Sequence, residues 1–188
     1  MKFLTFKHRV FVIALLMEAG INLHAQQSMQ MPTLISQSLA KLQQSTPEAF
    51  LNCIAELKRI DAMFPDSIQP KYQMALQSLN FAVMNPHAPQ TEKMLLEVEI
   101  MIEKMEQQRV VIMTPGTCLA NSYLSDLCTL RGFFYMVRIV QNPTQNGQRY
   151  YIDVMQNYEK ALKLNPNNQL AAQLQQKFLE GMKQQTRN

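Results

Sequence analysis

Apolar residues recur along most of this chain at intervals of three and four, the period of an amphipathic α-helix. Prolines interrupt the pattern, and proline fits the first turn of a helix or the residues beyond its end but not its middle. The stretches between prolines predict helices over about 32–44, 69–84, 89–108, 117–141, 149–164 and 168–183. A further helix is expected to begin near 47 and to extend beyond 60. Because the loops between them are short, we expect a row of antiparallel helical hairpins.

Two of these helices carry clear signals. Thr46 and Pro47 offer a hydroxyl cap and a proline in the first turn, so a helix is expected to begin there. In the helix over 89–108, the stripe expected to face the core consists of Met94, Val98, Met101 and Met105.

Three segments fit the helical pattern less simply. Residues 110–113 are apolar but are followed at once by Pro115 and Gly116, so we expect 109–117 to form a buried loop. Residues 133–137 are apolar nearly all round, which predicts a helix covered on two sides. Residues 143–147 are expected to form a polar turn.

The N-terminus has the order of a secretory signal peptide. Basic residues precede an apolar run over 10–17, and Ala25 ends a segment with small residues, so cleavage is expected after Ala25. Glu18 interrupts the apolar run, which is much shorter than the ~20 residues of a membrane span. We therefore predict an exported protein, periplasmic or secreted, with residues 26–188 as a single domain. The alternative is an uncleaved N-terminal anchor.

Composition supports an all-α domain without a nucleic-acid partner. Residues 26–188 are rich in glutamine and methionine, which are good helix formers, and the chain has no tryptophan. The formal net charge is only +4, part of which lies in the signal segment. No basic stripe with interleaved aromatic residues is present, so nucleic-acid binding is not expected.

The three cysteines allow two interpretations. Cys118 and Cys128 lie ten residues apart on one expected helix, about 15 Å along its axis, which is too far for a disulfide between them. Cys53 would pair with either of them, or all three are buried thiols that pack as small apolar side chains.

One spacing recurs at two distant places. It separates Val154, Tyr158, Ala161 and Pro166 by four, three and five residues. The same intervals separate Cys53, Leu57, Ile60 and Pro65. Such spacing puts three apolar residues on one helical face and a proline just beyond the helix end.

This spacing resembles the second half of a tetratricopeptide repeat, and the most specific stretch runs from Tyr158 to Asn168. In that family the first helix carries a glycine and, three residues later, an aromatic residue; Gly132 and Tyr135 match this pair. The chain is also similar to small exported bacterial proteins with degenerate repeats and an elongated hairpin near the C-terminus. The resemblance implies a right-handed stack of antiparallel helical hairpins, a TPR-like α-solenoid.

The sequence departs from the family pattern in two ways. Arg131 replaces the usual leucine, and roughly ten extra residues, including 142–147, separate the two halves of the repeat. The alternative to a solenoid is an irregular helical bundle whose final hairpin ends in a common motif.

The residues needed for catalysis are not apparent. His87 is the only histidine after residue 25 and stands in a proline-rich turn, where we expect it to be solvated. Neither His87 nor Cys53 is surrounded by a nucleophile motif, and the glycines form no phosphate loop. We therefore predict a protein that is not an enzyme and has no metal or cofactor.

The resemblance implies a protein or peptide partner held in a groove lined by the first helix of each hairpin. By register with Gly132, the groove-facing candidates are Asp126, Thr129, Phe133 and Met136. The alternative for Phe133 and Met136 is plain core packing. Two other functions stay open: a structural subunit of a cell-envelope assembly, and a small-molecule binder with a pocket between hairpins.

Overall fold

The computed structural model describes residues 30–44, 46–112 and 117–185, and the regular secondary structure among these residues is helical, without a strand. A helical stretch over 30–40 leads into η1 (Lys41–Gln44). The helices that follow are α2 (Pro47–Met63), α3 (Gln69–Met84), α4 (Thr91–Ile112), α5 (Cys118–Gln141), α6 (Pro143–Leu164) and α7 (Gln169–Gln185). The all-α fold class is thus confirmed, whereas the expected signal peptide over 1–25 lies outside the described residues.

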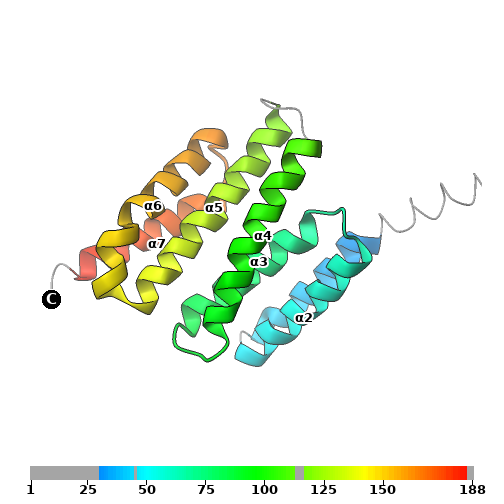
Figure 1. Ribbon diagram of the computed structural model, residues 1–188, viewed down its shortest axis with the longest axis horizontal. Helices are drawn as coiled ribbons and strands as arrows, with labels where there is room; N and C mark the ends of the chain where they lie inside the picture. The colour runs from blue at the N-terminus through cyan, green and yellow to red at the C-terminus, as the bar shows by residue number, and fades with distance from the viewer. Residues whose placement is uncertain (1–29, 45, 113–116, 186–188) are drawn as a thin grey trace, which may run out of the picture.

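Each helix packs on its neighbours in sequence, and α5 is the centre of the arrangement. It contacts α3, α4, α6 and α7, and its largest interface is with α6. In Figure 1, α4, α5 and α6 lie side by side with α3 and α7 behind them. The apolar run over 133–137 is covered from more than one side, as expected for a helix in this position.

Capping side chains set where several helices begin. The hydroxyl of Thr46 accepts a hydrogen bond from the Ala49 amide at 3.2 Å, and Thr117 accepts one from Ala120 at the same distance. A cap of this kind satisfies one of the amides that the first turn leaves unpaired. The start predicted from Thr46 and Pro47 is therefore confirmed.

The polar turn expected over 143–147 is wrong, because α6 begins at Pro143. Asn142 caps this helix by accepting a hydrogen bond from the Gln145 amide at 3.2 Å, and Pro143 fits the first turn. Asn146 also donates to the Arg138 carbonyl at 2.6 Å, which ties the new helix to the end of α5. The segment is polar because it is an exposed first turn, not because it is a loop.

The extra residues of the last hairpin are therefore helical and lengthen both helices. On the facing side of α6, Val154, Tyr158 and Ala161 are fully buried, as expected from their spacing. The ring of Tyr158 lies directly on the backbone of Gly132: a Cβ atom there would stand 2.7 Å from Cε1 of Tyr158. Tyr135, by contrast, is half-buried and stacks on Tyr150 with ring centroids 5.3 Å apart. Pro166 lies exposed between α6 and α7.

Two expectations for α4 need correction. Its fully buried face is formed by Leu95, Val98, Ile102 and Met105. Met94 and Met101 are only half-buried, so the expected stripe is rotated around the helix, because α4 packs on α3 and α5 at once. The buried loop expected over 109–117 is also wrong for residues 109–112, which continue α4. Residues 113–116 lie outside the described part of the chain.

The cysteines are free thiols in different places. Cys53 is buried beside Leu57, with the Ser38 hydroxyl 3.6 Å from its sulfur. Cys128 is buried in a separate cluster with Ala161. Cys118 is exposed at the first residue of α5, so the expectation of three buried thiols is wrong for this residue.

Two helical glycines, Gly132 and Gly147, predict opposite effects of the same substitution. Gly132→Ala would press a methyl group into the Tyr158 ring, so we expect it to lower the free energy of unfolding by about 1–3 kcal/mol. Gly147→Ala has nothing within 4 Å of the new Cβ and is expected to raise it by about 0.5–1 kcal/mol through helix propensity. Urea denaturation followed by circular dichroism compares them. Equal effects of the two substitutions would contradict the close contact at Gly132.

Candidate functional site

The residues expected to line a groove lie largely in the core. Thr129 and Phe133 are 1% and 2% exposed, Met136 is 9% exposed, and Asp126 is half-buried. The expectation that all four face a partner is therefore corrected: Thr129 and Phe133 are inaccessible, and the alternative of core packing holds for Phe133. Met136 belongs to the core but also borders an open hollow.

The first turn of α7 covers the first half of this face of α5. Asn168 caps α7 by accepting a hydrogen bond from the Ala171 amide at 3.0 Å. Its amide nitrogen donates to Ser125 Oγ at 2.8 Å, to Asp126 Oδ1 at 3.1 Å and to Thr129 Oγ1 at 3.2 Å. One buried asparagine therefore starts α7 and fixes it on α5.

The two hydroxyls continue this polar network into α5 and α6. Ser125 Oγ donates to the Ala161 carbonyl at 2.8 Å, and Thr129 Oγ1 donates to the Ser125 carbonyl at 2.8 Å. Burial raises the pKa of the Asp126 carboxyl, and the hydrogen bond from Asn168 opposes the rise. Burial also raises the pKa of Tyr72, with a smaller contribution from the Asp126 charge.

Beyond this anchor, an apolar hollow of about 280 Å³ opens between the C-terminal parts of α3, α5 and α7. We call it the inner hollow. Its lining consists of Val83, Met136, Ile139, Val140, Lys177, Phe178, Gly181 and Met182. Of these described residues Lys177 is the only charged one, and it is exposed. The inner hollow is thus a shallow apolar site with one cation in its lining.

A second hollow, of about 450 Å³, lies between the start of α6 and the end of α7, and we call it the outer hollow. Its lining consists of Pro143, Thr144, Gly147, Gln148, Tyr151, Ile152 and Met182. Apolar side chains are exposed at this end of the molecule, where α3, α5 and α7 end and α6 begins (Figure 1). Among them Ile152 is 61% exposed and Met84 54%.

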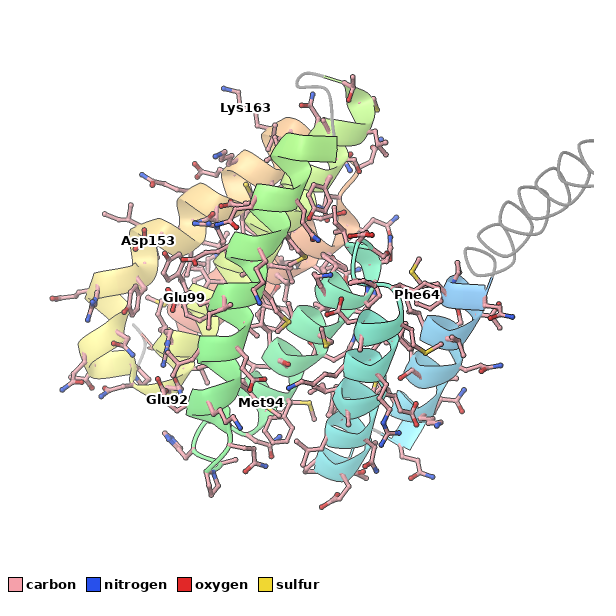
Figure 2. All side chains as sticks on the ribbon, turned by 45° about the vertical axis from the view of Figure 1, so that its right-hand side comes forward. Phe64, Glu92, Met94, Glu99, Asp153 and Lys163 are labelled. Atoms are coloured by element: carbon pink, nitrogen blue, oxygen red, sulfur yellow. The ribbon has the colours of Figure 1, made fainter. Side chains whose placement is uncertain are left out.

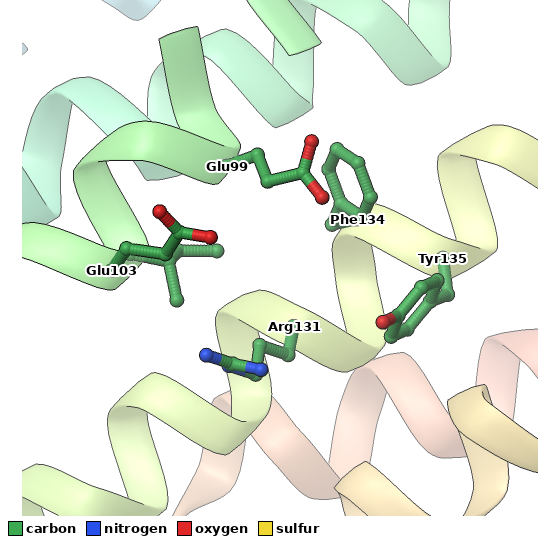
Figure 3. A pocket seen from close by; sticks show the side chains of 6 residues that line it. Glu99, Glu103, Arg131, Phe134 and Tyr135 are labelled. Carbon is green, nitrogen blue, oxygen red and sulfur yellow. The ribbon is translucent and has the colours of Figure 1, made fainter. Parts of the chain in front are cut away.

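A third cavity, between α4 and α5, is shown in Figure 3 and has a volume of only about 50 Å³. Glu99 and Glu103 approach it from α4, and Arg131, Phe134 and Tyr135 from α5. This volume accommodates a few water molecules and is far below the several hundred Å³ of ordinary ligand pockets.

Ion pairs join α4 and α5 on this side of the molecule. Arg131 forms one with Glu106 at 2.6 Å. Arg138 contacts Glu92 at 2.7 Å and lies over the Phe134 ring, and its guanidinium holds the pKa of Glu92 below the usual value. Glu92 and Glu99 are carried by α4, as Figure 2 shows. These ion pairs connect α4 and α5 beside a cavity that is too small for an ordinary ligand, so the inner and outer hollows are stronger candidate sites than this cavity.

Other chemistry has little support in the described part of the chain. His87 is exposed in the loop between α3 and α4, as expected. Across residues 30–44, 46–112 and 117–185, no group of three or more histidine, cysteine or acidic side chains is arranged to hold a metal ion. No helix in these ranges combines the length and the hydropathy needed to cross a membrane.

Sequence reasoning missed most residues of the two hollows, although some signals were present. Phe178 and Met182 belong to the apolar stripe of α7, which packs on the core. Only the packing shows that these two residues also line the inner hollow. Ile152 stands off the buried face formed by Val154 and Tyr158. An apolar residue off the buried face of an amphipathic helix is the signal that indicates this surface.

The network around Asn168 predicts a large effect of one substitution. Asn168→Ala removes the cap of α7 and leaves buried polar groups without their donor, so we expect a loss of about 2–4 kcal/mol in the free energy of unfolding. The control is Asn167→Ala at the exposed neighbouring position. Urea denaturation measures both, and a similar small loss for the two variants would exclude Asn168 as the anchor.

The raised pKa of Asp126 predicts a dependence on pH. The folded state binds a proton at this carboxyl more readily than the unfolded state, whose pKa is about 3.9. The stabilisation is therefore fully present below that pH and is lost as the pH rises through the folded-state pKa. Asp126→Asn has no carboxyl group to titrate, so this loss of stability with rising pH disappears, while the side-chain oxygen still accepts a hydrogen bond from Asn168. We expect the unfolding free energy of the variant minus that of the parent to rise from about pH 4 towards neutrality; a flat difference would contradict this.

Comparison of the chain with protein-family models, with curated proteins and with solved structures finds no match in any of the three.

Proposed function

We propose that this chain is a non-enzymatic protein-interaction module of tetratricopeptide type, which binds a segment of another protein in the inner hollow. The observation that carries the proposal is the apolar lining of this hollow on the side shared by α3, α5 and α7. Val140 in its lining is 39% exposed, and such apolar surface grouped with neighbouring apolar residues is typical of interaction sites.

The packing pattern supports the assignment to the tetratricopeptide type. In a stack of hairpins, each hairpin contacts only its neighbours. Here α5 contacts α6 and also α3, α4 and α7. Gly132 and Tyr158 are two of the residues from which the resemblance was inferred, and they are in close contact.

The proposed location is outside the cytoplasm, in the periplasm or beyond the cell. The order of basic residues, an apolar run over 10–17 and small residues ending at Ala25 supports export. The partner would then be a protein of the cell envelope or of the surroundings.

A small-molecule ligand is the second candidate, because the volume of the inner hollow is close to the lower end of the range for ligand pockets. A structural role is the third, and it is favoured by further apolar side chains on α4, where Leu96 and Ile100 are about half exposed. Photocrosslinking from the inner hollow separates these three functions by the class of molecule that becomes attached to the probe.

Site-specific photocrosslinking in the native cell envelope tests the proposal. A photoreactive phenylalanine derivative replaces Gly181, which lines the inner hollow and has open space where a side chain would begin. The matched control carries it at Lys93, an exposed position on α4 away from both hollows. We expect one defined protein adduct from position 181 that is absent from position 93, detected by gel shift and mass spectrometry.

Two results would contradict the proposal. A small-molecule adduct without a protein adduct at position 181 would favour the ligand-binding alternative. A protein adduct of the same kind at both positions would favour an assembly that covers the molecule on several sides.

A further inference from the structure

The outer hollow lies at one edge of the row of helices. In Figure 1, α6 and the end of α7 form this edge, and α2 lies at the opposite one. The first turns of α6 and the last turns of α7 line the hollow, and α6 packs on α5 and α7. In a row of helical hairpins, an edge of this kind has the shape of the surfaces that neighbouring hairpins bury, so it needs a polar outer face or a cover.

This edge is apolar where the outer hollow lies. Ile152 lines the hollow and is nevertheless 61% exposed, so its side chain also protrudes from the surface. Tyr151 is 37% exposed, and its ring lies against that of Phe178 with centroids 5.6 Å apart. The wall of the hollow is therefore held by both α6 and α7. A protruding apolar side chain and a hollow that accepts one occur side by side.

The charges around the outer hollow balance. All of the described residues that line it are uncharged. The charged residues within two positions of the lining along α6 and α7 are two basic and two acidic ones, Arg149, Asp153, Glu180 and Lys183. A segment with charges of one sign would meet repulsion as well as attraction here, whereas a second copy brings both signs in equal number. An uncharged centre with tyrosine and methionine, surrounded by polar residues, is also the composition of protein interfaces.

We infer that a second copy of this chain covers the outer hollow in a two-fold symmetric contact, in which Ile152 of each copy enters the outer hollow of the other. A two-fold contact uses the same surface on both copies. Because Ile152 itself lines the hollow, the two Ile152 side chains contact each other next to the symmetry axis. This contact uses the outer hollow and the proposed function uses the inner one, so either can fail without the other.

The exposed apolar residues of α4 are less suited to such a contact. Leu96 and Ile100 are about half exposed, as Ile152 is. Glu97 and Glu99 are exposed between them in the sequence, and a two-fold contact here would bring these carboxylates near those of the second copy. Position 100 is therefore a matched control for position 152.

Sedimentation velocity of the full chain over a range of concentrations tests the pairing. We expect a monomer–dimer equilibrium with a dissociation constant of about 1–100 μM, because a small apolar contact supports only a weak complex. Ile152→Glu places two carboxylates together at the symmetry axis and is expected to raise this constant at least about tenfold. Ile100→Glu makes the same change on α4 and should leave the constant unchanged.

Mixing two variants tests the symmetry of the contact. Ile152→Glu and Ile152→Lys each bring like charges together, so each alone is expected to be monomeric where the parent is dimeric. Their mixture brings a carboxylate and an ammonium group together instead. We expect the mixture to recover the dimer at low salt and to lose it as salt is added.

A cysteine at the same position tests the distance across the axis. Cys118→Ser first removes the exposed native thiol. In that background, Ile152→Cys is expected to form a disulfide-linked dimer under mild oxidation, which requires Cα atoms within about 7 Å of each other. Ile100→Cys in the same background should remain largely monomeric on a non-reducing gel.

Other outcomes overturn the inference or a stated part of it. A parent chain that stays monomeric up to millimolar concentration excludes the pairing. Equal weakening by Ile152→Glu and Ile100→Glu, or a disulfide at position 100 in place of 152, excludes the outer hollow as the contact. Assemblies that grow beyond a dimer exclude the two-fold axis, because a head-to-tail contact does not close at two copies. A mixture that stays monomeric excludes contact between the two Ile152 side chains.

Discussion

The contact between the Tyr158 ring and the backbone of Gly132 is the constraint on which the rest of the structure depends. It lets α6 approach α5 so closely that this hairpin has the largest interface of the molecule. With α6 held there, α5 presents its remaining faces to α3, α4 and α7. A side chain at position 132 would separate the two helices, and the core around Phe133 and Val137 would lose its packing.

A second constraint divides the α5 face into a closed part and an open part. Asn168 satisfies buried hydroxyls of α5 and caps α7 at the same time, so α7 begins in a fixed place on Ser125 and Thr129. Such a network is stable because every member has a partner in the low-dielectric interior. Farther along α5 and α7, the space at Met136 and Val140 becomes the inner hollow. The proposed binding site thus lies next to the part of α5 that Asn168 holds against α7.

Much of the secondary structure was predictable because its causes are local. Prolines and capping hydroxyls act within one turn, which is why the start of α2 and the limits of α3 agree with expectation. The errors also have a local origin. A polar first turn resembles a loop in composition, so the start of α6 at Pro143 was missed, and the apolar stripe of α4 was rotated because two neighbours bury it at once.

The sequence by itself determined that the chain forms amphipathic helices separated by prolines, and that Val154, Tyr158 and Ala161 face inward, because helical periodicity and backbone restrictions are written in neighbouring residues. Only the tertiary structure decided which apolar residues remain exposed to solvent. Phe133 and Val140 lie on the same helix and have similar chemistry, yet one is buried and the other borders the inner hollow. The difference arises from where α7 covers α5, and that depends on contacts between residues about forty positions apart, such as Asn168 with Ser125.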